Sequence, residues 1–237
     1  RSVSAFLLNR SSDLLVENYN HQAYETEINT GTTFDIYNHE AVDRLLNENP
    51  QLLPEWKIDE EKDYLWNRQK VENCITQGII QGESLDQIAE RLARELKSTN
   101  MNKMRMFART AMTASQNAGR QKQMEDAEAR GIKISKQWIA TLDDRTRDTH
   151  QDLDGQTVGI SELFQVRKYK IRYPGDPSAA PEMVFNCRCT MKSVFKGIND
   201  KFGDRRAYRY NEKGYRESYI VKGMTYSEWK KSKEGKQ

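Results

Sequence analysis

Apolar residues recur at helical spacing through the first 130 positions of the chain. The spacing predicts a helix over residues 60–82, with Leu65, Val71, Ile75 and Ile79 near one face and Gly82 as the stop. Ser84 then opens a second helix, and Gln87 three positions later gives the spacing of a capping box. The apolar stripe of this second helix comprises Leu85, Ile88, Ala89, Leu92 and Leu96.

A longer helix is predicted from about Asn102 to Arg130, ended by Gly131. One face of it carries mainly small residues, which would let a neighbouring helix approach closely: Met104, Phe107, Ala108, Ala111, Ala114, Ser115 and Ala118. Residues 1–57 are interpreted as helix, loop and helix, with Ala41-Val42 and Leu45-Leu46 on one stripe that stops before Pro50.

The period changes after Gly131. Ile134, Lys136, Trp138 and Ala140 alternate with other residues in a β-prone run, and Asp143-Asp144 follows as a turn. Asp154-Gly155 is a second turn, residues 174–181 form a proline-rich loop, and residues 183–191 are expected to be another strand. A short helix capped by Thr225 is expected near the end, over residues 225–233.

The predicted fold class is therefore α+β, with a mostly helical N-terminal half followed by a small α+β C-terminal domain. Four segments are expected: an N-terminal helical partner-binding segment (1–57), a helical region (58–131), a small α+β domain (132–198) and a basic aromatic tail with a short helix (199–237). No apolar run approaches the roughly 20 residues that span a bilayer, so no membrane association is expected.

Composition and charge point to a protein that works by contact with partners. Hydrophobic residues make up 36% and charged residues 31%, and the mean hydropathy of −0.92 is polar for a compact enzyme of this size. Residues 192–237 carry thirteen Lys or Arg against six acids, interleaved with aromatic residues. This tail is suited to a DNA backbone or an acidic protein surface; a solvated, partly helical surface is the other interpretation.

Three residues in the second half are of the types that zinc prefers as ligands. Cys187 and Cys189 are expected to project from one face of a strand, because side chains alternate there, and His150 supplies an imidazole. No standard spacing provides a fourth ligand, for which Asp143 and Asp154 are the candidates. The other interpretation is that the two cysteines are small buried thiols and that His150 lies in a polar turn. Three cysteines in all are too few for a disulfide scaffold, so thiols are expected.

Enzymatic chemistry has weaker support. A Cys187 nucleophile with His150 as its base needs an oxyanion site, and the sequence offers no such loop. The acidic pairs Asp143-Asp144 and Asp152–Asp154 suggest a metal-dependent nuclease, but they lie in turn-like stretches dense with arginine, where internal salt bridges are the commoner explanation. No glycine loop of the Walker or dinucleotide type is present. We therefore expect no catalytic residues, with a nuclease or other DNA-acting enzyme as the alternative.

The same stretch resembles the phage Mu F-like family of head morphogenesis proteins, also called minor head or minor capsid proteins. The family pattern is a Trp-led strand, an Asp-x-Arg-Thr-Arg stretch, a His three residues on, a later Asp-Gly and a Cys-Arg-Cys strand. Its matches here are Trp138, Asp143 with Arg145-Thr146-Arg147, His150, Asp154-Gly155, and Asn186-Cys187-Arg188-Cys189. The helix that normally precedes this domain is similar to Ala108-Arg109-Thr110 and Asn117-Ala118-Gly119-Arg120, and residues 224–229 look like a common family ending. The likeness covers roughly residues 60–237 and is specific because several short motifs occur in order.

The resemblance implies a structural part of a tailed bacteriophage head, near the portal vertex, with a role in capsid assembly and in DNA packaging or ejection. The implied partners are the portal protein, the major capsid or scaffolding protein, and packaged double-stranded DNA. The implied location is the virion, in the capsid interior or at the portal vertex, after assembly in the host cytoplasm. Related domains also occur fused to toxin modules, so a trafficking domain of a phage-derived toxin is a third interpretation.

Overall fold

The computed structural model describes residues 22–24, 26, 29–30, 53–54, 64–195, 204–221, 223–225, 228 and 231. The helix predicted around Ala41–Leu46 lies outside the described residues. Within the first segment, the described residues between 22 and 30 are helical. Gln22 and Thr26 are fully buried, and the Gln22 amide Nε2 donates to Ser193 Oγ at 2.7 Å. This part of the first segment therefore packs on the second half of the chain.

The helical half consists of α3 (Tyr64–Ile80), α4 (Leu85–Glu95) and the first part of α5 (Met101–Ala129). The capping box of α4 is confirmed, because Ser84 N donates to Gln87 Oε1 at 2.8 Å and Gln87 N donates to Ser84 Oγ at 3.4 Å. The three helices enclose an apolar cluster in which Ile75, Ile88 and Leu92 are fully buried. These helices agree with the amphipathic pattern of the sequence, and the end of α3 before Gly82 and the start of α4 after Ser84 are as predicted; the predicted start of the first helix near residue 60 lies outside the described residues.

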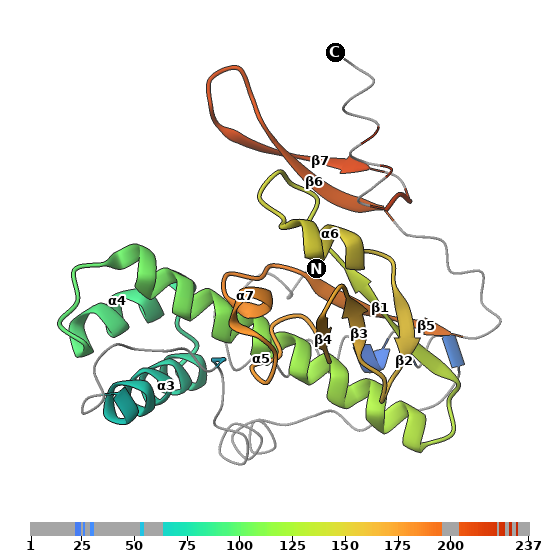
Figure 1. The fold of residues 1–237 in the computed structure, drawn as a ribbon, viewed down its shortest axis with the longest axis horizontal. Helices are drawn as coiled ribbons and strands as arrows, with labels where there is room; N and C mark the ends of the chain where they lie inside the picture. Colours follow the sequence, from blue (N-terminus) through green and yellow to red (C-terminus); the bar gives the residue numbers. More distant parts are fainter. Residues whose placement is uncertain are drawn as a thin grey trace, which may run out of the picture.

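Helix α5 is the longest element and runs across the molecule, with α3 and α4 near its start and the strands along its remaining length (Figure 1). It begins after Asn100, whose side chain accepts from Lys103 N, and stops before Gly131 at φ +84°. Ala108 and Ala111 pack in the α3–α4 cluster, as the small-residue face predicts. Farther along, Ala114 faces a loop instead: a Cβ added to Gly175 would lie 2.9 Å from Ala114 N. The predicted close helix neighbour is therefore confirmed only for the first part of this face.

The second half is built on a three-stranded antiparallel sheet in the order β2–β1–β5, formed by Thr157–Gly159, Ile134–Ile139 and Thr190–Phe195. The register pairs Lys136 with Ser193 and Trp138 with Met191. Alternate residues of β1 are buried, as predicted, and α5 contacts β1 and β5. A two-stranded ladder of β3 (Phe164–Val166) and β4 (Tyr169–Ile171) adds Phe164 to the core beside Trp138.

Lys136 is an unusual member of this core because its side chain is fully buried. Its Nζ donates to Arg172 O at 2.9 Å and to Gln121 Oε1 at 3.2 Å, and it lies 5.5 Å from the centre of the Phe164 ring. Burial lowers the pKa of Lys136 to about 8, because the charged form loses its hydration there.

Two elements differ from the sequence-based predictions. The expected strand over residues 183–191 starts only at Thr190; the short helix α7 (Pro181–Val184) and a loop precede it. The predicted basic tail contains an antiparallel hairpin, β6 (Arg205–Tyr210) and β7 (Arg216–Val221), joined by a turn with Gly214 at φ +75°. Two features of the sequence could have revealed this hairpin: the alternation of Arg206, Tyr208 and Tyr210, and the Asn-Glu-Lys-Gly turn.

The hairpin is part of the second core, since Ala207 and Val221 are buried with Trp138 and Cys187. At the C-terminal end, the predicted cap is present: Thr225 N donates to Glu228 Oε2 at 2.7 Å, and Glu228 N donates back to Thr225 Oγ1 at 3.3 Å. The α+β fold class is confirmed. Among the described residues, no helix has the length and apolar character needed to cross a bilayer.

Candidate metal centre

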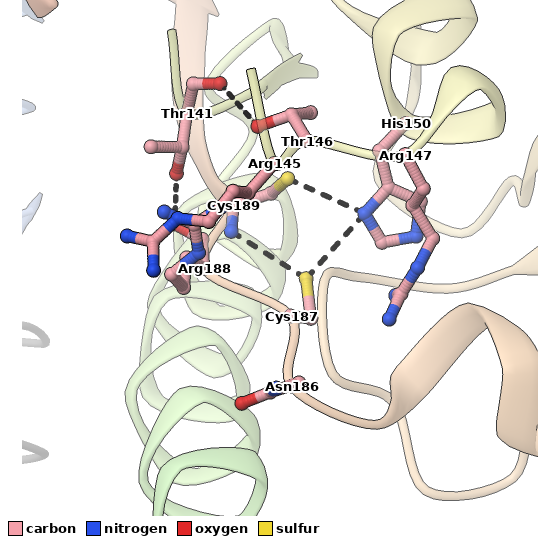
Figure 2. Close-up of a pocket in the computed structure, with 9 residues that line it drawn as sticks. All are labelled: Thr141, Arg145, Thr146, Arg147, His150, Asn186, Cys187, Arg188 and Cys189. Carbon is pink, nitrogen blue, oxygen red and sulfur yellow. Dashed lines mark hydrogen bonds between the residues drawn. The ribbon is translucent and has the colours of Figure 1, made fainter. Parts of the chain in front are cut away.

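The structure brings together the three residues that the sequence singled out as metal ligands. His150 lies in the short helix α6 (Asp148–Leu153), and Cys187 and Cys189 lie in the loop between α7 and β5. His150 Nδ1 is 3.4 Å from Cys189 Sγ and 3.7 Å from Cys187 Sγ (Figure 2). All three ligand atoms lie within 4.8 Å of one another, and all three residues are buried.

Two local details of that prediction were wrong. His150 is on a helix and not in a turn, and the cysteines are in a loop and not on a strand. The alternation argument therefore does not explain why the sulfurs point the same way. Asn186, at φ +60°, reverses the chain before the cysteines, and Cys189 N then donates to Cys187 Sγ at 3.4 Å. The loop folds around the first sulfur and places the second beside it.

The second imidazole nitrogen fixes the tautomer of His150. Nε2 lies 3.0 Å from the carbonyl oxygen of Met183, which can only accept, so Nε2 carries the hydrogen. Nδ1 is then left with its lone pair directed at both sulfurs. Trp138 stacks edge-on against the ring, with centroids 5.3 Å apart. A backbone acceptor behind a histidine is the usual arrangement for a metal ligand, since it orients the ring and raises its basicity.

Helix α5 positions the cysteine loop through a ladder of polar side chains. Asn186 N donates to Thr110 Oγ1 at 2.9 Å, and Thr113 Oγ1 donates to Cys187 O at 2.9 Å. One turn on, Asn117 Nδ2 donates to Cys189 O at 3.2 Å. Thr110, Thr113 and Asn117 are buried on one face of the helix. Sequence reasoning did not assign this role, although Thr110 and Asn117 belong to the motifs on which the family resemblance rests.

The two thiols do not ionise alike. A hydrogen bond from Cys189 lowers the pKa of Cys187 despite its burial, and the positive charges of Arg147 and Arg188 act in the same direction. The same shared hydrogen bond and burial raise the pKa of Cys189 well above its ordinary value. Of the two thiols, that of Cys187 is therefore the easier to ionise, and a positive ion between the residues would stabilise both thiolates.

The geometry fits a tetrahedral zinc ion. With Zn–S of about 2.3 Å and Zn–N of about 2.0 Å, tetrahedral coordination puts sulfur and nitrogen about 3.5 Å apart. The two observed sulfur–nitrogen distances lie on either side of that value. The pocket beside these residues has a volume of about 30 Å³. That is room for an ion or a water molecule, whereas organic ligands occupy pockets of roughly 300 Å³ or more.

Neither aspartate considered as a fourth ligand belongs to the group. Asp143 accepts two hydrogen bonds from Arg188, one at 2.9 Å, and another from Arg216 at 3.0 Å. Burial acts to raise the pKa of Asp143, but its bonds to Arg188 and Thr146 outweigh this and hold the pKa below its ordinary value. Both carboxylate oxygens are thus used in ion pairs, in agreement with the salt-bridge interpretation of the acidic pairs.

Asp154, the other candidate, also has a structural role, because it anchors the hairpin. Arg205 at the start of β6 donates to both of its carboxylate oxygens, at 2.8 and 2.9 Å, and also to Ala140 O and Met224 O. Asp154 in turn accepts from Ala140 N at 2.6 Å. The two side chains are 8% and 1% exposed, so this is a buried, fully hydrogen-bonded ion pair.

Comparison with known proteins matches this region to one family. Residues 69–192, just over half of the chain, match the family described as Phage Mu protein F like protein. The chain is 31% identical over 227 residues to Minor head protein GP7 of Bacillus phage SPP1, which covers 92% of this chain and 68% of that protein. No solved structure matches.

Two further relatives share only part of their length with this chain. The NAD(+)–arginine ADP-ribosyltransferase EFV of Enterococcus faecalis is 39% identical over 131 residues, 55% of this chain and 26% of that protein. Uncharacterized protein YqbB of Bacillus subtilis is 27% identical over 128 residues, 52% of this chain and 41% of that protein. The chain therefore spans about a quarter of the transferase and two fifths of YqbB.

Proposed function

Because this chain belongs to the Phage Mu protein F like family, we propose that it is a minor head protein of a tailed bacteriophage that assembles beside the portal. The observation that carries the proposal is the match to the SPP1 minor head protein, which extends over 92% of this chain and far beyond the family motifs. The proposed role is structural, in capsid assembly and in the packaging or ejection of DNA. It is exerted in the virion, in the capsid interior or at the portal vertex, after assembly in the host cytoplasm.

The location is tested on purified particles. Proheads and mature heads are isolated, and the protein is counted by quantitative mass spectrometry against the major shell protein. We expect far fewer copies than of the shell protein in both particles. Crosslinking within proheads should join the chain to the portal protein. Absence from both particles would overturn the assignment, while presence without any portal crosslink would overturn only the portal contact.

The proposed roles differ between the four segments of the chain. We propose that residues 1–57 contact the portal, capsid or scaffolding protein, because residues 1–56 carry nine acidic residues against three basic ones. The helical region 58–131 and the small domain 132–198 then form the body of the protein. Gln22 and Thr26 of the first segment are buried against this body, and Gln123 Nε2 donates to Thr26 Oγ1. Deletion of residues 1–20 should abolish capture by proheads and leave the melting curve of the body unchanged.

The basic C-terminal region is the proposed contact for packaged DNA. Arg206 and Lys213 are exposed on the hairpin, and so are Tyr210 and Tyr215. Removal of residues 205–237 is an unsuitable test, because the hairpin supplies Ala207 and Val221 to the core. The double variant Arg206→Gln/Lys213→Gln is suitable, and it should weaken retention on duplex DNA at low salt for any sequence. Unchanged retention would point to a protein partner for this region.

We further propose that His150, Cys187 and Cys189 hold a zinc ion with a structural role. When bound, zinc would keep both thiols ionised and join α6 to the cysteine loop across the 36 residues between His150 and Cys187. Three protein ligands leave one position for water or for a partner. Protein purified without chelators is expected to carry close to one zinc per chain by elemental analysis. The site should lose zinc as the pH falls, because protons compete for thiolate and imidazole.

The chain offers a matched control for this test. Cys74 is also a buried free thiol, but it lies in α3, in the apolar cluster of the helical half. Cys187→Ser should release zinc and loosen the second half, whereas Cys74→Ser should keep the metal. Less than about 0.2 zinc per chain in the unmodified protein, with a normal melting curve, would end the proposal.

The partial match to an ADP-ribosyltransferase raises the alternative of an enzyme or a toxin-associated module. That alignment covers 26% of the transferase, so most of that protein lies outside the match. An assay of NAD⁺ consumption and a nuclease assay with divalent metal test the enzyme alternatives directly. Portal and terminase genes beside the coding gene would favour the head protein over the toxin module. Metal-dependent activity lost in His150→Ala would favour the enzyme.

A further inference from the structure

Four arginines from distant parts of the chain lie beside the candidate metal centre and the Asp143 carboxylate. They are Arg109 on α5, Arg145 in the turn after β1, Arg188 between the cysteines and Arg216 at the start of β7, and together they are called the arginine face below. Arg109 Nη1 donates to Asn186 Oδ1 at 2.8 Å, which ties it to the cysteine loop. Arg188 and Arg216 share the carboxylate of Asp143.

Positive charge dominates at this face. The pKa of Arg109 lies below its ordinary value, first because of burial and then because the charges of Arg188, Arg145 and Arg216 repel its own. Asp143 is the buried acid between them, and its side chain is only 3% exposed. Its oxygens accept from Arg188 and Arg216, so it orients these two guanidinium groups. Asp144 is the exposed acid of the same turn, and Asp86 acts on Arg109 from α4, so four positive charges face three negative ones.

The guanidinium groups keep donors for a ligand. Arg145 is exposed, and its side chain makes no hydrogen bond or ion pair with the described residues; only its backbone N–H is used, toward Asp143. The Arg216 side chain is 37% exposed, and its guanidinium carbon lies 3.9 Å from the centre of the Tyr208 ring, which restricts its position. A planar guanidinium with free N–H groups matches the oxygens of a phosphate, and fixing it in advance reduces the entropy lost on binding.

We propose that the arginine face binds the phosphate groups of duplex DNA, as a second contact beside the hairpin; this rests on the DNA contact proposed above. A protein partner would need an apolar centre to its interface. The exposed large hydrophobic residues in the described part of the chain include none on α5, in the turn after β1 or in the cysteine loop; beside Arg216 they are Tyr210, its partner across the hairpin, and Tyr215, which precedes it. Contacts with phosphates need only oriented donors. Arg209 and Arg216 lie on the hairpin itself, so a duplex could follow positive charge from one contact to the other.

The test uses the full chain and a fluorescently labelled duplex of mixed sequence, with binding measured by anisotropy from roughly 50 to 200 mM salt. Arg109→Gln/Arg145→Gln should weaken binding at low salt and reduce the slope of log K against log salt by about 1.8, at about 0.9 for each phosphate contact. Arg94→Gln/Lys133→Gln is the control, because it removes two exposed positive charges away from the face. Arg145→Gln alone covers the case in which Arg109→Gln impairs folding, because the Arg145 side chain makes no hydrogen bond or ion pair with the described residues.

The outcomes separate the two proposals. If the unmodified protein binds with a salt-dependent affinity, and Arg145→Gln and the double variant bind as tightly and with the same slope, the arginine face does not contact DNA. The hairpin contact would then still stand. Unmodified protein that does not bind the duplex at low salt would overturn both DNA contacts. Inorganic phosphate that displaces the duplex at matched ionic strength would show that the face takes single phosphate ions, and the DNA assignment would then be wrong.

Discussion

Helix α5 packs against two regions that are stabilised in different ways. Near its start it meets α3 and α4, where the buried side chains are almost all apolar: Ile75, Ile88, Leu92 and their neighbours. Along its remaining length it meets the second half of the chain. There, buried polar and charged groups are common, among them Lys136, His150 and the Asp154–Arg205 pair.

The two regions differ in the kinds of substitution that they tolerate. An apolar cluster is sensitive to volume and shape, and many side chains of similar size satisfy it. A buried polar network depends on every partner, because one deletion leaves another charge or donor unsatisfied in a medium of low dielectric. The second half should therefore tolerate less change per residue than the helical half. The three predictions below test this comparison.

The largest effect is expected for Asp154→Asn. It removes the negative charge from the buried pair and leaves Arg205 uncompensated, which should reduce the free energy of unfolding by about 3–5 kcal/mol in urea denaturation. Asp152→Asn is the control, because the Asp152–Arg167 pair is more than half exposed on both sides and should change stability by less than about 1 kcal/mol. Equal stability of the two variants would contradict the importance of the buried pair.

An intermediate effect is expected for Ala111→Leu in the helical half. Ala111 is fully buried in the α3–α4 cluster, so the larger side chain should overpack the seam and cost about 1–3 kcal/mol in thermal unfolding. Ala129→Leu, at the exposed end of the same helix, should be nearly neutral. The zinc content of Ala111→Leu should equal that of the unmodified protein. If both stability and assembly were unchanged by Ala111→Leu, this face of α5 would not be packed as the structure has it.

The smallest effect is a pH dependence from Lys136. Its pKa is about 8 in the folded chain and 10.5 in the reference state, so between these values the unfolded chain binds more protons and stability rises with pH. The unfolding free energy of the unmodified protein should thus increase relative to Lys136→Met between about pH 8 and 10, by on the order of 1 kcal/mol per pH unit at most. Parallel curves for the two proteins would show that Lys136 titrates normally.

The helical half was largely predictable from the sequence, and the reason is physical. The stripe of Ile88, Ala89 and Leu92, the capping box at Ser84 and the stop at Gly131 are local signals that act within one or two turns of chain. The buried alternation of β1, including Lys136, was also predictable because it has the period of a strand. The three candidate ligands followed from residue types alone, and the structure places them together.

The parts that were missed depend on contacts between distant residues. The hairpin was interpreted as a tail because many of its side chains are polar, and its stability comes from Ala207, Val221 and the buried Arg205 in the core of the preceding residues. The cysteine segment lacks strand geometry because Thr110, Thr113 and Asn117 bind its backbone in place of a neighbouring strand. These three residues recur at helical spacing, but the spacing does not reveal which distant segment they bind.

The completion of the second core by the hairpin has a consequence for the order of synthesis. The buried residues of the helical half run from Leu53 to Ala111, whereas the second half needs Arg205 and Val221 from far downstream. Roughly 110 residues separate the two events, and at 5–20 residues per second a ribosome takes about 5–20 s to add them. During that interval the helices can fold. Cys187 and Cys189 are not yet buried when they are made, because Ala207 and Val221, which complete their core, are synthesised later. Both thiols are therefore uncovered for the roughly 2–6 s that a ribosome needs to add the residues from Cys189 to Val221.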